Sequence, residues 1–107
     1  IFSRYLRLKA KGICEKCGRQ VGFARLQVSH FKGRRKKSTR WDEKNISVIC
    51  FFCHQHLGEN PDEHDIWFRK RLGEKEYKNL IVRAEIPKKP DLKLLTIYYE
   101  KLLSEME

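Results

Sequence analysis

The 107-residue sequence has no apolar run that approaches the length of a membrane span, and nothing in it resembles a signal peptide. It also lacks repeats and low-complexity tracts. These absences argue against a membrane association or secretion, so we expect an intracellular, cytoplasmic protein. The chain opens on Ile1 rather than methionine, and we expect its natural start to lie upstream. Its length predicts a single domain, residues 1–107, with a core small enough to benefit from a bound metal.

Acidic residues are scarce in the first half of the chain. Residues 1–57 hold 14 Lys/Arg against 3 Asp/Glu, a net charge of +11, whereas residues 58–107 hold 10 against 11, a net charge of −1. An excess confined to one half favours a polyanionic partner, nucleic acid above all, over the alternative of a solvated basic face. The loop at residues 32–40 is the most basic stretch. Its side chains predicted to contact phosphates are Lys32, Arg34, Arg35, Lys36, Lys37 and Arg40.

The four cysteines form two Cys-x2-Cys pairs, Cys14 with Cys17 and Cys50 with Cys53. A two-residue gap lets both thiolates of a pair point at one metal, and two pairs complete a tetrahedral structural Zn²⁺ site. The alternatives are two disulfides, or buried thiols without a metal. Because nothing suggests secretion, we predict a zinc site.

Hydrophobic periodicity and turn residues predict an α+β chain. The expected elements are a helix to about residue 11, strands at 26–31 and 46–49, and helices after Cys53, over 60–73, around 77–84 and from Asp91 onward. Asn60 is expected to cap its helix, with Pro61 at the first position. The last helix carries an apolar stripe that we expect to pack on the core, a homodimer seam being the alternative. This stripe consists of Leu92, Leu95, Tyr99, Leu102 and Met106.

Three residues between the cysteine pairs suggest chemistry: fourteen residues separate His30 from Asn45, and eight separate Asn45 from His54. Phosphodiester cleavage needs an activated water, a Lewis acid near the phosphate and stabilisation of the leaving oxygen. A neutral imidazole accepts the proton of water near neutral pH, because its unperturbed pKa is about 6.5. His30 near a strand end and His54 at a helix start can face each other across one cation. Asn45 is then either an oxygen ligand or the group that fixes the loop after His30.

This series of motifs resembles the zinc-framed HNH endonucleases, and the phage-type branch of lambda NinG (Rap)-like recombination proteins fits best. The resemblance covers nearly the whole chain. The matching segments are the first cysteine pair, Ser29-His30-Phe31, Thr39-Arg40-Trp41-Asp42-Glu43-Lys44-Asn45 and Cys50-Phe51-Phe52-Cys53-His54, with weaker matches over residues 1–7 and 58–73.

The resemblance implies a small zinc-stapled ββα-metal finger with its core at about residues 12–60. An N-terminal helix and a C-terminal helical extension over about residues 61–107 flank this core. His30 is then the general base, His54 binds a catalytic Mg²⁺ or Mn²⁺, and Asn45 supports the loop or joins the metal shell. The implied activity is metal-dependent hydrolysis of phosphodiester bonds in duplex or branched recombination DNA, in a bacterial or phage-infected host cell. Resolution of a junction needs two coordinated cuts, which implies a homodimer.

Ser29 departs from the family pattern, because many HNH enzymes carry a metal-binding aspartate directly before the first histidine. Asp42, Asn45, His56 or a water are candidates to complete the metal shell instead. His54, in contrast, is the ligand type of ordinary HNH proteins, although replacement of a cysteine at the zinc is an alternative role for it. The rival functions are a zinc-finger-like DNA-binding module without catalysis and an RNA-binding zinc ribbon.

Three further side chains have expected places in the fold. Phe51 and Phe52 are expected to pack against the strand that carries His30. His64, in the first turn of a predicted helix, is expected at the surface.

Overall fold

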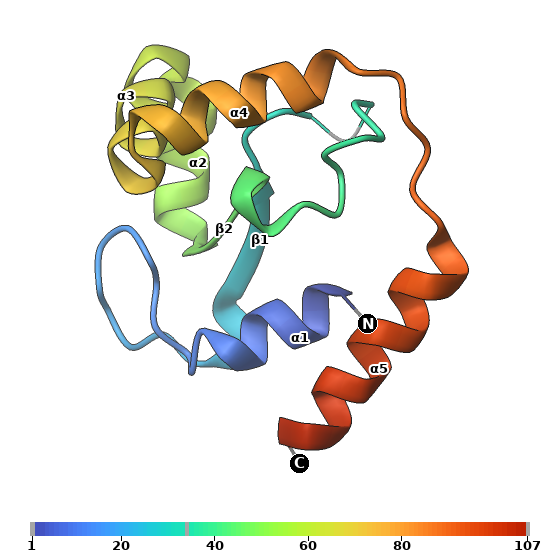
Figure 1. The fold of residues 1–107 in the computed structure, drawn as a ribbon. Helices are drawn as coiled ribbons and strands as arrows, with labels where there is room; N and C mark the ends of the chain where they lie inside the picture. Colours follow the sequence, from blue (N-terminus) through green and yellow to red (C-terminus); the bar gives the residue numbers. More distant parts are fainter. Residues whose placement is uncertain (1, 34, 107) are drawn as a thin grey trace.

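The computed structural model describes residues 2–33 and 35–106, so Arg34 of the predicted phosphate-binding set lies outside the described residues. Figure 1 follows the chain through the helices and the two strands. The elements are α1 (Phe2–Lys9), η1 (Phe23–Arg25), β1 (Leu26–His30), η2 (Glu43–Asn45), β2 (Ile46–Cys50), α2 (Phe51–Glu59), α3 (Pro61–Leu72), α4 (Glu74–Glu85) and α5 (Leu92–Met106). The predicted α+β class is therefore confirmed.

Strands β1 and β2 form an antiparallel pair in which Val28 lies opposite Val48 and His30 lies opposite Ile46. Side chains alternate between the two faces of a strand. Gln27 and Ser29 therefore share one face, and His30, at the last position of β1, leaves on the other. Every residue of β2 is buried, so this short strand is the centre of the molecule.

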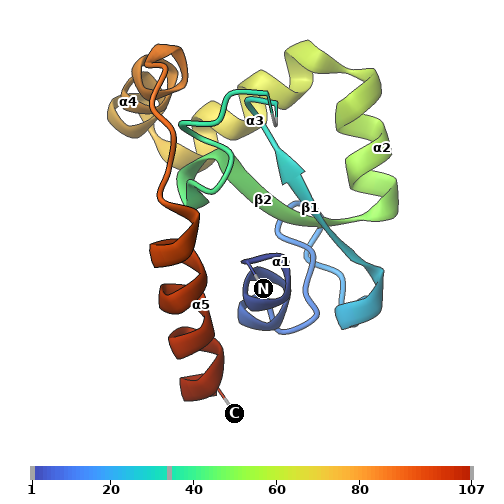
Figure 2. The same cartoon turned by 90° about the vertical axis from the view of Figure 1, so that its right-hand side faces the viewer.

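The sheet lies between two helical layers (Figure 2). Helix α1 covers one face, and α2 covers the other with α3 beside it. Leu6 of α1 and Leu57 of α2 enter one hydrophobic cluster with the strands. The buried members of this cluster are Leu6, Cys14, Leu26, Ile46, Val48, Ile49, Cys50 and Leu57. Two of the four cysteines thus belong to the core itself.

Helix α1 ends at Lys9 because the next turn adopts left-handed backbone, with φ of 56° at Lys11 and 78° at Gly12. A side chain at Gly12 has no room, since its Cβ would come within 2.6 Å of the Gln20 amide nitrogen and 3.2 Å of the Gly22 Cα. This tight turn delivers the chain into the first cysteine pair.

Asn60 precedes α3 as predicted, but its side chain does not cap that helix. Its amide nitrogen instead donates a hydrogen bond of 2.7 Å to the carbonyl of His56, in the last turn of α2. Glu63, the expected capping-box partner, accepts from His56 at 2.9 Å. The side chains at this corner therefore join α3 to the end of α2, which local sequence rules do not anticipate.

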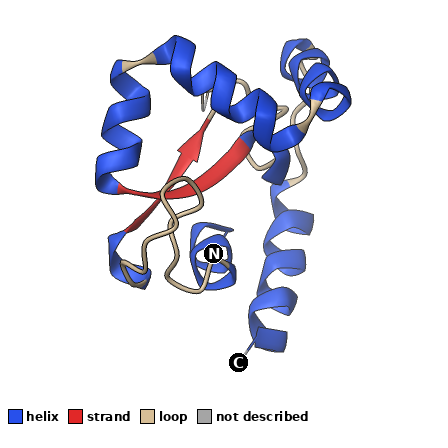
Figure 3. Cartoon of the chain, turned by 90° about the vertical axis from the view of Figure 1, so that its left-hand side faces the viewer, coloured by secondary structure: helices blue, strands red, loops and turns tan. Residues whose placement is uncertain are grey.

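Helix α5 packs only through the middle of its predicted stripe. Tyr99 is buried with its ring 4.7 Å from that of Phe2 and 5.2 Å from that of Tyr5, whereas Leu92 and Met106 are exposed. Figure 3 shows α5 standing beside α1, at the edge of the molecule. The stripe thus attaches the C-terminal helix to the N-terminal one.

Phe51 and Phe52 do not pack against β1, contrary to the sequence-based expectation. Helix α2 begins at Phe51, directly after the buried Cys50, and the two rings are 54% and 69% exposed. The early helix start turns Cys53 and Leu57 toward the core, so the side chains of Phe51 and Phe52 extend into solvent.

Candidate functional site

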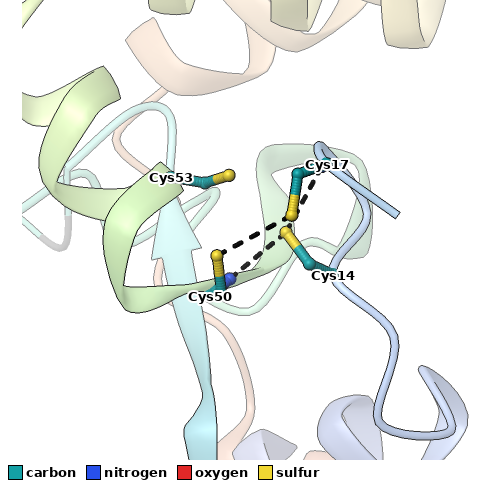
Figure 4. A group of neighbouring side chains, drawn as sticks. All are labelled: Cys14, Cys17, Cys50 and Cys53. Carbon is teal, nitrogen blue, oxygen red and sulfur yellow. Dashed lines mark hydrogen bonds between the residues drawn. The ribbon is translucent and has the colours of Figure 1, made fainter. Parts of the chain in front are cut away.

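The four cysteines come together from two distant segments, the turn after α1 and the junction of β2 with α2 (Figure 4). Their sulfur atoms all lie within 4.8 Å of one another. Over residues 2–33 and 35–106, this is the one group of three or more His, Cys, Asp or Glu side chains close enough to share a metal ion. All four are free thiols, with 3.9 Å between the sulfurs of Cys17 and Cys50. The disulfide alternative is therefore not the state of this structure.

Backbone groups support this cluster. The sulfur of Cys14 accepts hydrogen bonds from the backbone N–H groups of Cys17, at 3.5 Å, and Cys50, at 3.3 Å. Glu15 joins the first pair to the rest of the molecule, because its carboxylate accepts from the Val48 N–H at 3.2 Å and pairs with Arg71 at 2.8 Å. The cysteines are thus fixed on both sides by the strand and by α3.

The electrostatics of the cluster favour a bound cation. A hydrogen bond from the Arg19 side chain lowers the pKa of Cys17 to about 6, whereas burial raises the pKa of Cys53. Neighbouring thiolates repel each other, so all four ionise together only around a positive ion. Four sulfur donors from two Cys-x2-Cys pairs fit a structural Zn²⁺.

His54 lies in the first turns of α2, and its Nδ1 is 2.5 Å from the side-chain oxygen of Gln27 on β1. An amide oxygen only accepts, so Nδ1 carries the proton and the lone pair of the ring lies on Nε2. Histidines that bind metals usually donate the other ring N–H to such an oxygen. Sequence reasoning missed Gln27, although its position on the same strand face as Ser29 was a signal.

His30 is held from the opposite side of the strand. Its Nε2 lies 2.8 Å from the backbone carbonyl of Arg40, at the end of the basic loop. A carbonyl cannot donate, so Nε2 carries the proton and the lone pair of the neutral imidazole lies on Nδ1. The loop and the strand end therefore set the tautomer of His30.

Asn45 is fully buried and its side-chain amide joins both ends of the basic loop. The side-chain oxygen accepts from the Lys32 N–H at 2.7 Å, and the amide nitrogen donates to the carbonyls of Lys32 and Thr39, at 2.9 and 3.0 Å. Of its two predicted roles, this geometry favours support of the loop over metal binding, because its oxygen already accepts a backbone N–H.

His64 is not an exposed surface histidine. It is half-buried, with its ring 5.2 Å from that of Phe31 and 5.9 Å from that of Phe68. Burial lowers the pKa of His64, and the nearby His54 lowers this pKa further. Its Nε2 is buried and has no hydrogen-bond partner. Sequence reasoning missed this residue, because only the packing of α3 on Phe31 brings it toward the site.

The space beside His54 contains other unsatisfied polar groups. Ser29 is 3% exposed, and the register sets it opposite Ser47, whose hydroxyl is buried without a hydrogen-bond partner. Buried polar atoms nearly always have partners, so orphaned atoms mark a place for a bound ion or water. The nitrogen atoms of His54 and His64 with the hydroxyl of Ser29 form a donor set that fits a divalent cation.

Two other candidates for the metal shell have structural partners instead. Asp42 forms an ion pair with Arg83 at 2.8 Å and accepts from the Lys44 N–H at 3.0 Å. His56 is exposed and paired with Glu63. Their bonds connect the loop to α4 and α2 to α3, respectively.

The basic loop is anchored at its base and exposed at its tip. Ser38 donates to the Arg83 carbonyl at 2.7 Å, and Thr39 is completely buried. Arg35, Lys36 and Lys37 are exposed, with one weak contact of 3.4 Å from Lys36 to Glu85. Lys32 and Arg40 are half-buried at the two ends of the loop. The charges are therefore presented on a fixed frame next to His30.

No family model, curated protein or solved structure matches this chain. The described part of the chain includes no helix that is both long and apolar enough to cross a membrane.

Proposed function

We propose that this protein is a metal-dependent endonuclease of the HNH type that hydrolyses phosphodiester bonds in DNA. The main support is the preset state of the two imidazoles. His54 donates from Nδ1 to Gln27, which leaves Nε2 for a metal, and His30 donates from Nε2 to the Arg40 carbonyl, which makes Nδ1 its basic nitrogen. The order strand, strand, helix with a four-cysteine frame agrees with the ββα-metal architecture that the sequence motifs suggested.

In the proposed reaction, Nδ1 of His30 takes a proton from the attacking water near neutral pH. Asn45 keeps the loop at the distance that orients His30, because it bonds both Lys32 and Thr39. His54 and His64 would hold the catalytic Mg²⁺ or Mn²⁺, with the Ser29 hydroxyl beside them. When bound, such a cation stabilises the charge on the phosphate and the leaving oxygen. The end of β1 separates these two functions, so a phosphate there is reached from both sides.

The DNA partner is supported by charge. The basic excess lies wholly in residues 1–57, and the exposed Arg35, Lys36 and Lys37 stand on the loop that ends at the His30 contact. Phosphate contacts give affinity without reading sequence, so we propose a nuclease of low sequence specificity that acts on duplex or branched DNA. The Zn²⁺ held by the cysteines has a structural role.

A second candidate function is a nucleic-acid-binding zinc module without catalysis. Two observations favour it: Ser29 occupies the position of the usual aspartate, and in the described chain the cysteines alone form a cluster of three or more His, Cys, Asp or Glu ligands. In this case the basic loop binds nucleic acid and the histidines stabilise the fold.

Cleavage of matched labelled substrates separates the two functions. A four-way junction, the same sequence as duplex, a single strand and RNA are incubated with Mg²⁺, Mn²⁺ or EDTA, with His54→Ala as the inactive control. The nuclease predicts cutting that needs the added metal and is lost in the variant. Binding without cutting under every metal would establish the zinc module, and preferential binding of RNA would establish the RNA ribbon.

A further inference from the structure

Three exposed phenylalanines and several arginines lie together beside the candidate site. Phe51 and Phe52 meet edge to face at 5.8 Å, and Phe23, 38% exposed, is covered on one side by the Arg7 guanidinium at 4.3 Å. A groove of about 350 Å³ runs next to Phe51 and Phe52. Arg19 and Arg25 line this groove, and no acidic side chain does among the described residues.

The exposed rings are not explained by packing. A folded chain of this size rarely leaves two adjacent phenylalanines more than half exposed, and such a patch usually marks an interaction site. The arginines set the chemistry of the partner: a purely apolar protein surface would leave two guanidinium groups facing it without counter-charge. A ligand with flat apolar faces and negative charges fits both features.

Unpaired nucleotides have this combination, because each base offers a face for aromatic stacking and each phosphate an anion for arginine. Bases in a duplex are already stacked on each other and offer only their edges, so a duplex cannot use the rings in this way. The groove also reaches the candidate site directly, since Gln27 lines it and bonds His54.

We propose that Phe51 and Phe52, with Arg19 and Arg25, form a platform that binds unpaired DNA bases. The inference rests on the proposed function in one respect, that the bound strand belongs to the DNA the protein acts on. The platform gives the protein a preference for DNA with unstacked bases, which the phosphate contacts of the basic loop do not provide.

Binding measured by fluorescence anisotropy tests the platform without cleavage, in zinc-loaded protein with no other divalent metal added. The ligands are a short oligo-dT strand, an abasic strand with the same phosphates, and a matched duplex. The Phe51→Ala/Phe52→Ala variant is compared with the wild type and with Ile66→Ala/Val82→Ala, which removes two equally exposed apolar side chains from α3 and α4. Zinc content and circular dichroism show whether each variant is folded.

The proposal predicts that the double phenylalanine variant loses about fivefold or more of its affinity for oligo-dT, and keeps its affinity for the abasic strand and the duplex. The control variant keeps all three. Phe52→Leu, which retains apolar area without the ring, predicts a smaller loss on oligo-dT alone and decides the matter if the double variant does not fold. Equal losses on all three ligands, no loss, or a wild-type dimer that the variant converts to monomer would overturn the platform.

Failure of this inference is distinct from failure of the nuclease. A wild type that binds oligo-dT through the phenylalanines but cuts no substrate contradicts only the nuclease. A wild type that cuts DNA while the double variant binds oligo-dT normally contradicts only the platform.

Discussion

At the scale of single residues, the site is defined by which atoms already have partners. His30, His54 and Asn45 each use one side of their polar group to hold neighbouring backbone or side chains. These bonds fix which nitrogen of each imidazole carries the lone pair, and they engage the Asn45 amide oxygen with backbone. The chemistry follows from these assignments, which the sequence motif alone does not contain.

Asn45→Ala should lower the free energy of unfolding by about 2–3 kcal/mol, because three backbone groups of a buried loop lose their partner. Denaturant unfolding measures this change. Asn60→Ala, which removes an exposed side chain with one backbone hydrogen bond, is the control and should change stability by less than about 1 kcal/mol. Unchanged stability with weakened Mn²⁺ binding would show that Asn45 is a metal ligand instead.

His64→Gln should weaken binding of Mn²⁺ to the zinc-loaded protein by about tenfold or more, because the buried Nε2 is removed from the donor set beside His54. Electron paramagnetic resonance of free and bound Mn²⁺ measures the affinity. The matched control is His56→Gln, an exposed histidine paired with Glu63, which should bind Mn²⁺ as the wild type does. Equal affinity in the two variants would exclude His64 from the metal site.

At the scale of elements, the cysteine cluster connects the turn after α1 to the start of α2. These segments are more than thirty residues apart, with Cys14 and Cys50 buried in the same core cluster as both strands. Zinc at this point therefore orients α2, and α2 carries His54.

Cys14→Ser should abolish zinc binding and cooperative unfolding, because the binding free energy of a structural zinc, about 10–16 kcal/mol in small domains, is folding free energy. Atomic absorption gives the zinc content and circular dichroism follows the thermal transition. Strong chelation of wild-type protein should have the same effect. A variant that melts like wild type without zinc would show that the cysteines are ordinary buried thiols.

The basic loop is a second element with a separable role. Replacing Arg34, Arg35, Lys36 and Lys37 with glutamine should flatten the dependence of DNA affinity on salt, by up to about 0.9 in logarithmic slope for each duplex phosphate that the variant leaves without a cation. Replacing Lys70, Lys75, Lys78 and Lys101, exposed on α3, α4 and α5, removes the same charge from the other half. If both variants change the slope equally, the affinity depends on net charge and the loop has no special role in binding DNA.

At the scale of the whole molecule, local signals predicted the elements well and the contacts between them poorly. Alternation, helical periodicity, Gly73 and the Asp91 cap placed strands and helices close to their observed bounds. The cysteine spacing also predicted a cluster that the fold assembles. These features depend on neighbouring residues in the chain, where steric and hydrogen-bond rules act directly.

The missed features depend on how distant elements pack. The Gln27 contact to His54 needs α2 across β1, and the burial of His64 needs α3 against Phe31. The exposure of Phe51 and Phe52 depends on where α2 begins relative to the core. None of these has a signal in sequence spacing, although the polar face formed by Gln27 and Ser29 on β1 pointed to the first.

The most direct test of the central claim is single-turnover cleavage of labelled DNA by wild type and His30→Ala in saturating Mg²⁺ or Mn²⁺. Zinc content and DNA affinity of both proteins are measured in the same preparations. A general base at His30 predicts a rate lower by about 10²–10⁴ in the variant, with zinc and affinity unchanged. Equal cleavage rates in the two proteins would contradict the account, because no proton would then pass to His30.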